Sequence, residues 1–192
     1  MHACCADCDI FVKNQLNAYP AYNAQTTNNK TTKQQKQINE SNRGVSGKLK
    51  GSHVSFKQDD PFSPVKVSGH IENLAPGKHG FHVHQFGNLL SSDCTSCGGH
   101  FNPTNAEHGS RSGTNSHAGD FGNITATKEY YSTFYFSTTK ISLFEGDLSV
   151  IGRSLVVHED EDDLGKGGFP DSLTTGHAGK RLDCAVIGYD KE

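Results

Sequence analysis

Short segments of alternating apolar and polar residues dominate the chain from about Gly44 onward. They span residues 48–57, 65–74, 80–86, 130–137, 141–143, 154–158 and 185–189, and turn-forming Gly, Pro, Asn or Asp separates them. A period of two places successive side chains on opposite faces of a strand. No window of useful length has helical periodicity. The pattern therefore predicts an all-β domain, a sandwich or a barrel.

Two long stretches interrupt this pattern, residues 87–121 and 159–184. Both are rich in Gly, Ser, Asp and His. Loops of this length inside a compact domain are usually functional, so we expect most of the chemistry in them or beside them.

The chain before Gly44 has a different character. Residues 23–42 are almost all Asn, Gln, Thr, Lys and Ser, with only Ala24 and Ile38 apolar, and such a composition predicts a linker that is not ordered by a core. We therefore divide the chain into an extension at 1–43 and one domain at 44–192. The first strand of the domain is ambiguous: residues 37–45 are polar, and residues 10–12 are the alternative across the linker.

Length and charge narrow the function classes. The 192 residues suffice for one domain with a real core. A net charge of -3 gives no global field that would attract nucleic acid or an anionic membrane. The sequence has neither an apolar run of about 20 residues nor the pattern of a signal peptide. We expect a soluble cytoplasmic protein with no membrane or nucleic-acid partner.

Histidines supply the candidate chemistry. His82 and His84 lie two apart in an alternating segment, so their imidazoles project from one face of a strand. His158 ends a later strand and would complete a metal site with them. In the first long loop, His100, His108, His117 and Asp120 have the slack to wrap a tetrahedral site of three nitrogens and one oxygen. Imidazole-rich sites suit zinc and copper.

Six motifs in this order resemble the copper/zinc superoxide dismutase family, over about residues 44–189. They are GFHVHQFG at 80–87, GHFNP at 99–103, GDFGN at 119–123, VVHE at 156–159, DDLGKGG at 162–168 and GKRLDCAVIG at 179–188. The resemblance implies a Greek-key β-sandwich, or flattened barrel, with a zinc and disulfide loop and an electrostatic loop. It also implies one copper and one zinc ion per subunit.

By the same resemblance, superoxide is the substrate, and alternate reduction and reoxidation of copper converts it to oxygen and hydrogen peroxide. The implied copper ligands are His82, His84, His100 and His158; the implied zinc ligands are His100, His108, His117 and Asp120. His100 then bridges both metals and supplies a proton, and Arg181 holds the anion beside copper.

The resemblance assigns three further residues. Asp162 links the copper ligand His82 to the zinc ligand His108 and so orients both rings. Cys94 and Cys184 match the family's disulfide. Cys97, Cys4, Cys5 and Cys8 have no assigned role.

The resemblance further implies a homodimer with its interface near Phe86, Ile151 and residues 187–188, and a copper chaperone is a candidate partner. The loop at 169–175 lacks the family's lysine, so weaker steering of superoxide is expected. Electrostatic steering of superoxide is known for this family, and we expect it here only because of the resemblance. The Asn- and Lys-rich linker fits an AT-rich genome such as that of a large DNA virus, whose enzyme would blunt oxidative defence in the host cytoplasm or the virion.

Two other function classes compete with the enzyme. A copper-delivery protein would explain the Cys-x-x-Cys pair at Cys5 and Cys8, but fewer than fifty residues precede the β region, too few for a second folded metal domain. A catalytically inactive relative would lack a copper ligand or the arginine, and all of these residues are present.

Overall fold

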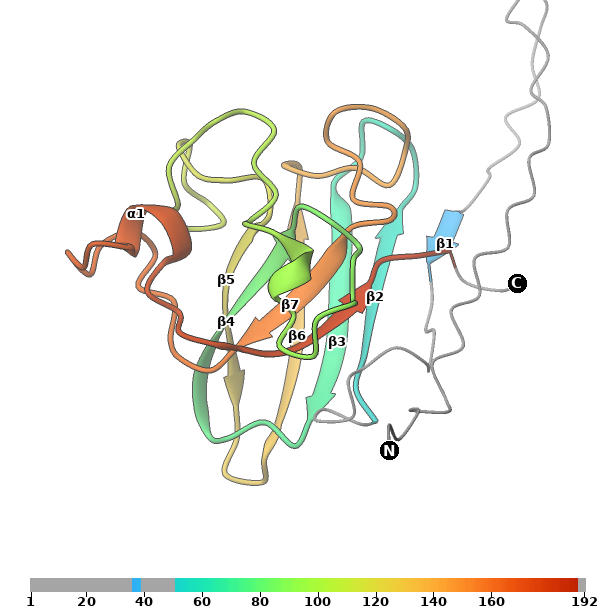
Figure 1. Cartoon of the computed structure of the whole chain (residues 1–192). Coiled ribbons are helices and arrows are strands. Elements are labelled where there is room, and N and C mark those ends of the chain that lie inside the picture. The colour runs from blue at the N-terminus through green and yellow to red at the C-terminus, as the bar shows by residue number, and fades with distance from the viewer. Residues whose placement is uncertain (1–35, 39–50, 190–192) are drawn as a thin grey trace, which may run out of the picture.

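A computed structural model describes residues 36–38 and 51–189, and these residues form two antiparallel sheets with very little helix (Figure 1). The strands are β1 (Lys36–Ile38), β2 (His53–Gln58), β3 (Val65–Glu72), β4 (Gly77–His84), β5 (Asp120–Ala126), β6 (Tyr131–Thr138), β7 (Ser154–His158) and β8 (Arg181–Val186). A 3-10 turn, η1 (Thr95–Cys97), and a four-residue helix, α1 (Ser172–Thr175), lie in the two long loops.

The strand order makes this a sandwich with Greek-key connections. One sheet runs β1-β2-β3-β6 and the other β5-β4-β7-β8, so β6 pairs with β3 and β7 pairs with β4, strands distant in sequence. The sheets bury a common core that includes Val67, Phe81, Phe121, Phe136 and Leu155. The predicted all-β sandwich is confirmed.

The two sheets differ in what covers their outer faces. In β3 burial alternates, with Val65, Val67 and Ile71 inward, as expected for a strand with one face in solvent. The last six residues of β4 and all five of β7 are buried. Phe81 and Val157 face the core, so the opposite faces of these strands lie beneath the long loops.

The structure corrects several predicted elements. Residues 36–38, inside the predicted linker, form β1 and pair with β2, because strand pairing uses the backbone and does not require an apolar sequence. Residues 141–143 alternate like a strand, but the backbone N–H of Leu143 donates to the Gln58 side chain at 2.8 Å. Strand β5 was missed, and the last strand begins at Arg181, four residues earlier than predicted.

Some predictions lie outside the described residues. Residues 10–12, the alternative first strand, and Cys4, Cys5 and Cys8 are among them. Within the described ranges, no helix has the length and apolar character needed to cross a membrane.

Candidate metal centre

The outer faces of β4 and β7 carry three of the predicted ligands. Phe81 faces the core, so His82 and His84 on either side of Val83 project outward together. His158 ends β7, and its neighbour Val157 pairs with Phe81. The two strands therefore bring residues far apart in sequence to one surface beneath the loops.

His82, His84, His100 and His158 form one group, here called the N4 group. One ligand nitrogen from each lies within 4.8 Å of the others. The Nε2 atoms of His84 and His158 are 3.3 Å apart, and the rings of His82 and His100 have centroids 4.0 Å apart. The structure thus brings together the four histidines that the sequence predicted as copper ligands.

His100, His108, His117 and Asp120 form a second group, here called the N3O group. Asp120 Oδ1 lies 2.9, 3.0 and 3.1 Å from the Nδ1 atoms of His100, His108 and His117. A zinc ion bonded at 2.0–2.1 Å to a tetrahedron of such atoms would set them about 3.3 Å apart. The three oxygen–nitrogen distances are thus close to the spacing that zinc requires.

His100 belongs to both groups. Its Nδ1 faces Asp120, its side chain is 3% exposed, and its backbone bridges to His84 at the edge of β4. A ring held through Nδ1 in the N3O group leaves Nε2 for the N4 group. Among the described residues, no other histidine is shared by the two groups.

Asp162 connects the two groups from behind. Its Oδ2 accepts from His82 Nε2 and its Oδ1 from His108 Nε2, both at 2.8 Å. Accepting these bonds fixes the proton on each Nε2, so both Nδ1 atoms are left as the ligand nitrogens. The predicted pairing of Asp162 with these two histidines agrees with this geometry.

Several buried polar atoms of the two groups lack the hydrogen-bond partners that they need. The Nδ1 atoms of His82 and His108 are buried and have no hydrogen bond; His108 Nδ1 is near Asp120 but poorly aligned. Unpartnered buried nitrogens are costly. In addition, one carboxylate oxygen has two lone pairs, too few for the three nitrogens around Asp120 Oδ1. Cations in both groups would satisfy these atoms.

Burial sets the charge of the N4 group. It is the main cause that lowers the pKa of His82 and His84 well below the usual range, with repulsion from His100 and His158 adding to it. Burial also lowers the pKa of His158 to about 3. These rings are therefore neutral at pH 7, the form in which imidazole binds a metal.

In the N3O group, by contrast, the charged forms of the side chains are favoured. Burial lowers the pKa of His108, but the adjacent Asp120 and Asp162 carboxylates stabilise its charged form more strongly and raise the pKa to about 9. Burial likewise opposes ionisation of Asp120, yet hydrogen bonds from the histidines hold its pKa far below the usual range. In the metal-free protein His108 carries a proton, which a metal must displace.

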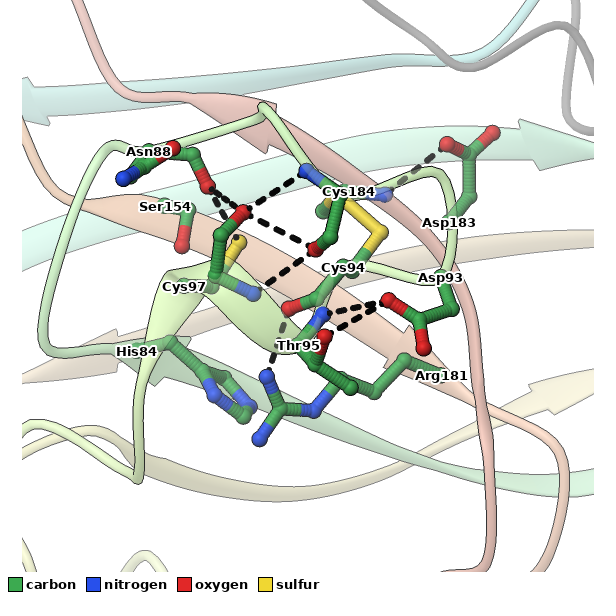
Figure 2. The surroundings of a disulfide bond; sticks show 12 residues. His84, Asn88, Asp93, Cys94, Thr95, Cys97, Ser154, Arg181, Asp183 and Cys184 are labelled. Carbon is green, nitrogen blue, oxygen red and sulfur yellow. Dashed lines mark hydrogen bonds between the residues drawn. A yellow bond between two sulfur atoms is a disulfide. The ribbon is translucent and has the colours of Figure 1, made fainter.

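Arg181 and the disulfide lie near His84, a member of the N4 group (Figure 2). The Arg181 guanidinium donates from Nη1 to the carbonyl of Cys94 at 2.5 Å and from Nη2 to that of Gly98 at 2.7 Å. The Gly98 carbonyl also accepts from His84 Nδ1 at 2.9 Å. Cys94 is bonded to Cys184, so the predicted disulfide is present and its loop anchors the arginine.

Sequence reasoning missed three supporting residues. Asn123 exchanges two hydrogen bonds with the backbone of Asp162, at 2.7 and 2.8 Å. A Cβ at Gly176 would lie 2.2 Å from Asp162 Oδ1. A Cβ at Gly80 would lie 2.7 Å from Ala178 and 3.3 Å from His158. These three residues lie inside or beside the motifs, which is the only indication of them in the sequence. The sequence does not identify their contacts.

Comparison with known proteins agrees with the site. The family model for copper/zinc superoxide dismutase matches residues 49–187. A curated protein of Dictyostelium discoideum, "Superoxide dismutase [Cu-Zn] 5", is 51% identical over 138 residues, which cover 72% of this chain and 90% of that protein.

Proposed function

This chain belongs to the copper/zinc superoxide dismutase family, and from that premise we propose that the N4 group binds copper and the N3O group zinc. The protein is an oxidoreductase that converts two superoxide anions and two protons to oxygen and hydrogen peroxide, a reaction of antioxidant defence. Copper and zinc are its cofactors, and copper supplies the redox chemistry by accepting one electron from superoxide and returning it to another.

The observation that carries the assignment is the position of His100 in both groups. Asp162 directs the Nδ1 of His82 to one group and the Nδ1 of His108 to the other, and both nitrogens lack hydrogen bonds. Four imidazoles alone suit copper, whereas three imidazoles and a carboxylate suit tetrahedral zinc.

We propose that His100 supplies a proton to the reaction at the N4 group. Its Nδ1 is held toward Asp120 at 2.9 Å, so the ring keeps its place while Nε2 gains or loses a proton. A positioned imidazole of this kind is a common proton donor. Without the N3O group, the ring would have no fixed orientation toward the N4 group.

Arg181 is proposed to bind superoxide. Backbone carbonyls of Cys94 and Gly98 each take one of its N–H groups, and the remaining donors are available to an anion. Because a guanidinium keeps its charge and has a planar set of donors, it attracts the anion and orients it. Lys166, which is exposed in the second long loop, is proposed to add to the attraction.

We further propose a homodimer. Phe86, Leu90 and Val186 are exposed apolar side chains beside the disulfide loop and β8, and their burial against a second copy would be favourable. The sequence placed Ile187 in this interface, but its side chain is buried in the core of its own chain. Of the residues predicted from the sequence, Phe86 therefore stays in the proposed interface and Ile187 does not.

We propose that an extension precedes the dismutase domain and that the domain begins with β1 rather than at residue 44, because β1 pairs with β2. We also propose action in the cytoplasm and copper supplied by a chaperone. Fractionation of expressing cells and copper loading with and without a chaperone would test the last two points.

Superoxide decay followed directly tests the catalytic assignment. Protein loaded with copper and zinc should accelerate decay, and both His158→Ala and a copper-free sample should not. A matched control is His53→Ala, because His53 lies on β2, in the sheet that carries none of the ligands. Metal binding without faster decay would contradict the assignment.

A further inference from the structure

Between the zinc-group residues His108 and His117 lies the segment 109–116, with the sequence GSRSGTNS. It contains no large apolar side chain, so hydrophobic burial cannot hold it against the sandwich. The segment nevertheless leads into His117, whose Nδ1 lies 3.1 Å from Asp120 Oδ1. Polar contacts must therefore order it.

Two contacts hold the first part of the segment: Arg111 donates to the carbonyl of Phe121 at 3.2 Å, and the N–H of Gly109 donates to Asp120 Oδ2 at 3.0 Å.

Lys140, from outside the segment, supplies further contacts. Lys140 Nζ donates to the carbonyl of Gly113 at 2.6 Å and to the Ser116 hydroxyl. Ser116 is buried, and its hydroxyl donates in turn to the carbonyl of Ser110 at 3.0 Å. The N–H of Gly113 donates to the same carbonyl at 2.9 Å. The ammonium thus closes a hydrogen-bonded ring across both ends of the segment.

The backbone at Lys140 is held in place by its neighbours. It follows β6, its backbone N–H donates to the Thr138 hydroxyl at 3.2 Å, and the next residue, Ile141, is 2% exposed in the core. A long flexible side chain attached to a fixed backbone can hold a loop only if its contacts outweigh its lost rotamer freedom. Two hydrogen bonds from a charged donor meet that condition.

We infer that Lys140 is a positioning residue for zinc, holding segment 109–116 so that His117 is placed beside His108 and Asp120. The inference rests on the proposed assignment of zinc to the N3O group. Ser116 is adjacent to His117, so the contact of Lys140 with Ser116 acts one residue from a ligand.

Electrostatics alone makes the opposite prediction. The charges of Lys140 and Asp120 interact, and a cation near this carboxylate attracts it in the metal-free protein but repels a bound zinc dication. Removal of Lys140 would then tighten zinc binding. The sign of the change therefore distinguishes loop ordering from charge.

The experiment compares zinc affinity among full-chain variants. Metal-free wild type, Lys140→Met, Lys140→Arg and Ser116→Ala are titrated with zinc against a chromogenic chelator and with cobalt(II), whose visible spectrum reports tetrahedral coordination. Lys128→Met is the matched control, because Lys128 is exposed and lies in the turn between β5 and β6. Methionine keeps most of the lysine stem but removes charge and donors.

We expect Lys140→Met to weaken zinc binding about tenfold, as losses of groups behind metal ligands commonly do. Lys140→Arg should restore most of the affinity, Ser116→Ala should weaken it in the same direction, and Lys128→Met should match wild type. If Lys140→Met does not fold, Ser116→Ala decides the matter alone.

Unchanged or tighter zinc binding by Lys140→Met, or by Ser116→Ala where only that variant folds, overturns the inference. So does an equal loss in Lys140→Met and Lys140→Arg. Failure of the underlying assignment is a separate result: wild type would then show no tetrahedral cobalt spectrum, or Asp120→Ala would leave that spectrum intact.

Discussion

Removal of the disulfide should cost a large share of the stability of the metal-free protein. Cys94 and Cys184 are 90 residues apart in sequence. In the chain-entropy model, a crosslink that closes a loop of that length lowers the entropy of the unfolded chain and so raises the free energy of unfolding by about 4.6 kcal/mol. For a protein of this size, such a loss lowers the melting temperature by about 10 to 18 °C.

The test removes the disulfide from a parent variant that already carries Cys97→Ser. Cys97 is a free, buried thiol in the same cluster as the disulfide, three residues from Cys94, so it would compete for the released partner. Urea unfolding of metal-free Cys97→Ser and of Cys97→Ser with Cys184→Ser gives the two free energies of unfolding directly.

A difference below about 1 kcal/mol would refute the reasoning, because the disulfide would then not restrict the unfolded chain as the model requires. A second readout separates local from global effects. Since the Cys94 carbonyl accepts from Arg181, the metal-loaded double variant should also lose superoxide activity at temperatures where it stays folded.

Three further predictions concern the site. Asp162→Asn should weaken metal binding by about 10- to 100-fold in chelator competition, because an amide accepts from only one of the two imidazoles; unchanged affinity would contradict its role. Arg181→Gln should slow superoxide decay by about tenfold or more and flatten its dependence on salt, and a rate equal to wild type would exclude an anion-binding role. Metal-free stability should fall as pH drops from about 6.5 towards 3, by up to about 1.4 kcal/mol per pH unit for His158, whose folded pKa is lowered to about 3. His108, whose pKa is raised to about 9, has the opposite sign and loses its contribution as pH rises through that value. Urea unfolding across pH checks both signs, and a flat profile in acid would be inconsistent with neutral buried imidazoles.

The sequence predicted the parts of the site that depend on periodicity. Alternation in β4 was sufficient to place His82 and His84 on one face, and the pattern indicated an all-β sandwich. It could not show which nitrogen of each ring is left for a metal, because Asp162 decides that from a loop eighty residues away from His82.

Errors in the fold have equally local causes. Ile141 and Leu143 are buried and alternate as in a strand, yet a side chain, Gln58, accepts the N–H of Leu143 where a neighbouring strand would. β5 was missed because Asp120, Gly122 and Asn123 at its start resemble loop residues. In both places the partner of the backbone, which local sequence does not encode, decides the structure.

The loops above β4 and β7 also connect metal content with the lifetime of the protein. They cover Val156, which is 0% exposed, and they are held largely by histidines, carboxylates and one disulfide rather than by an apolar core of their own. We expect loss of the metals to loosen this cover over an apolar strand, and proteases and chaperones bind such surfaces. Cellular quality control would then distinguish loaded from empty enzyme without sensing either metal.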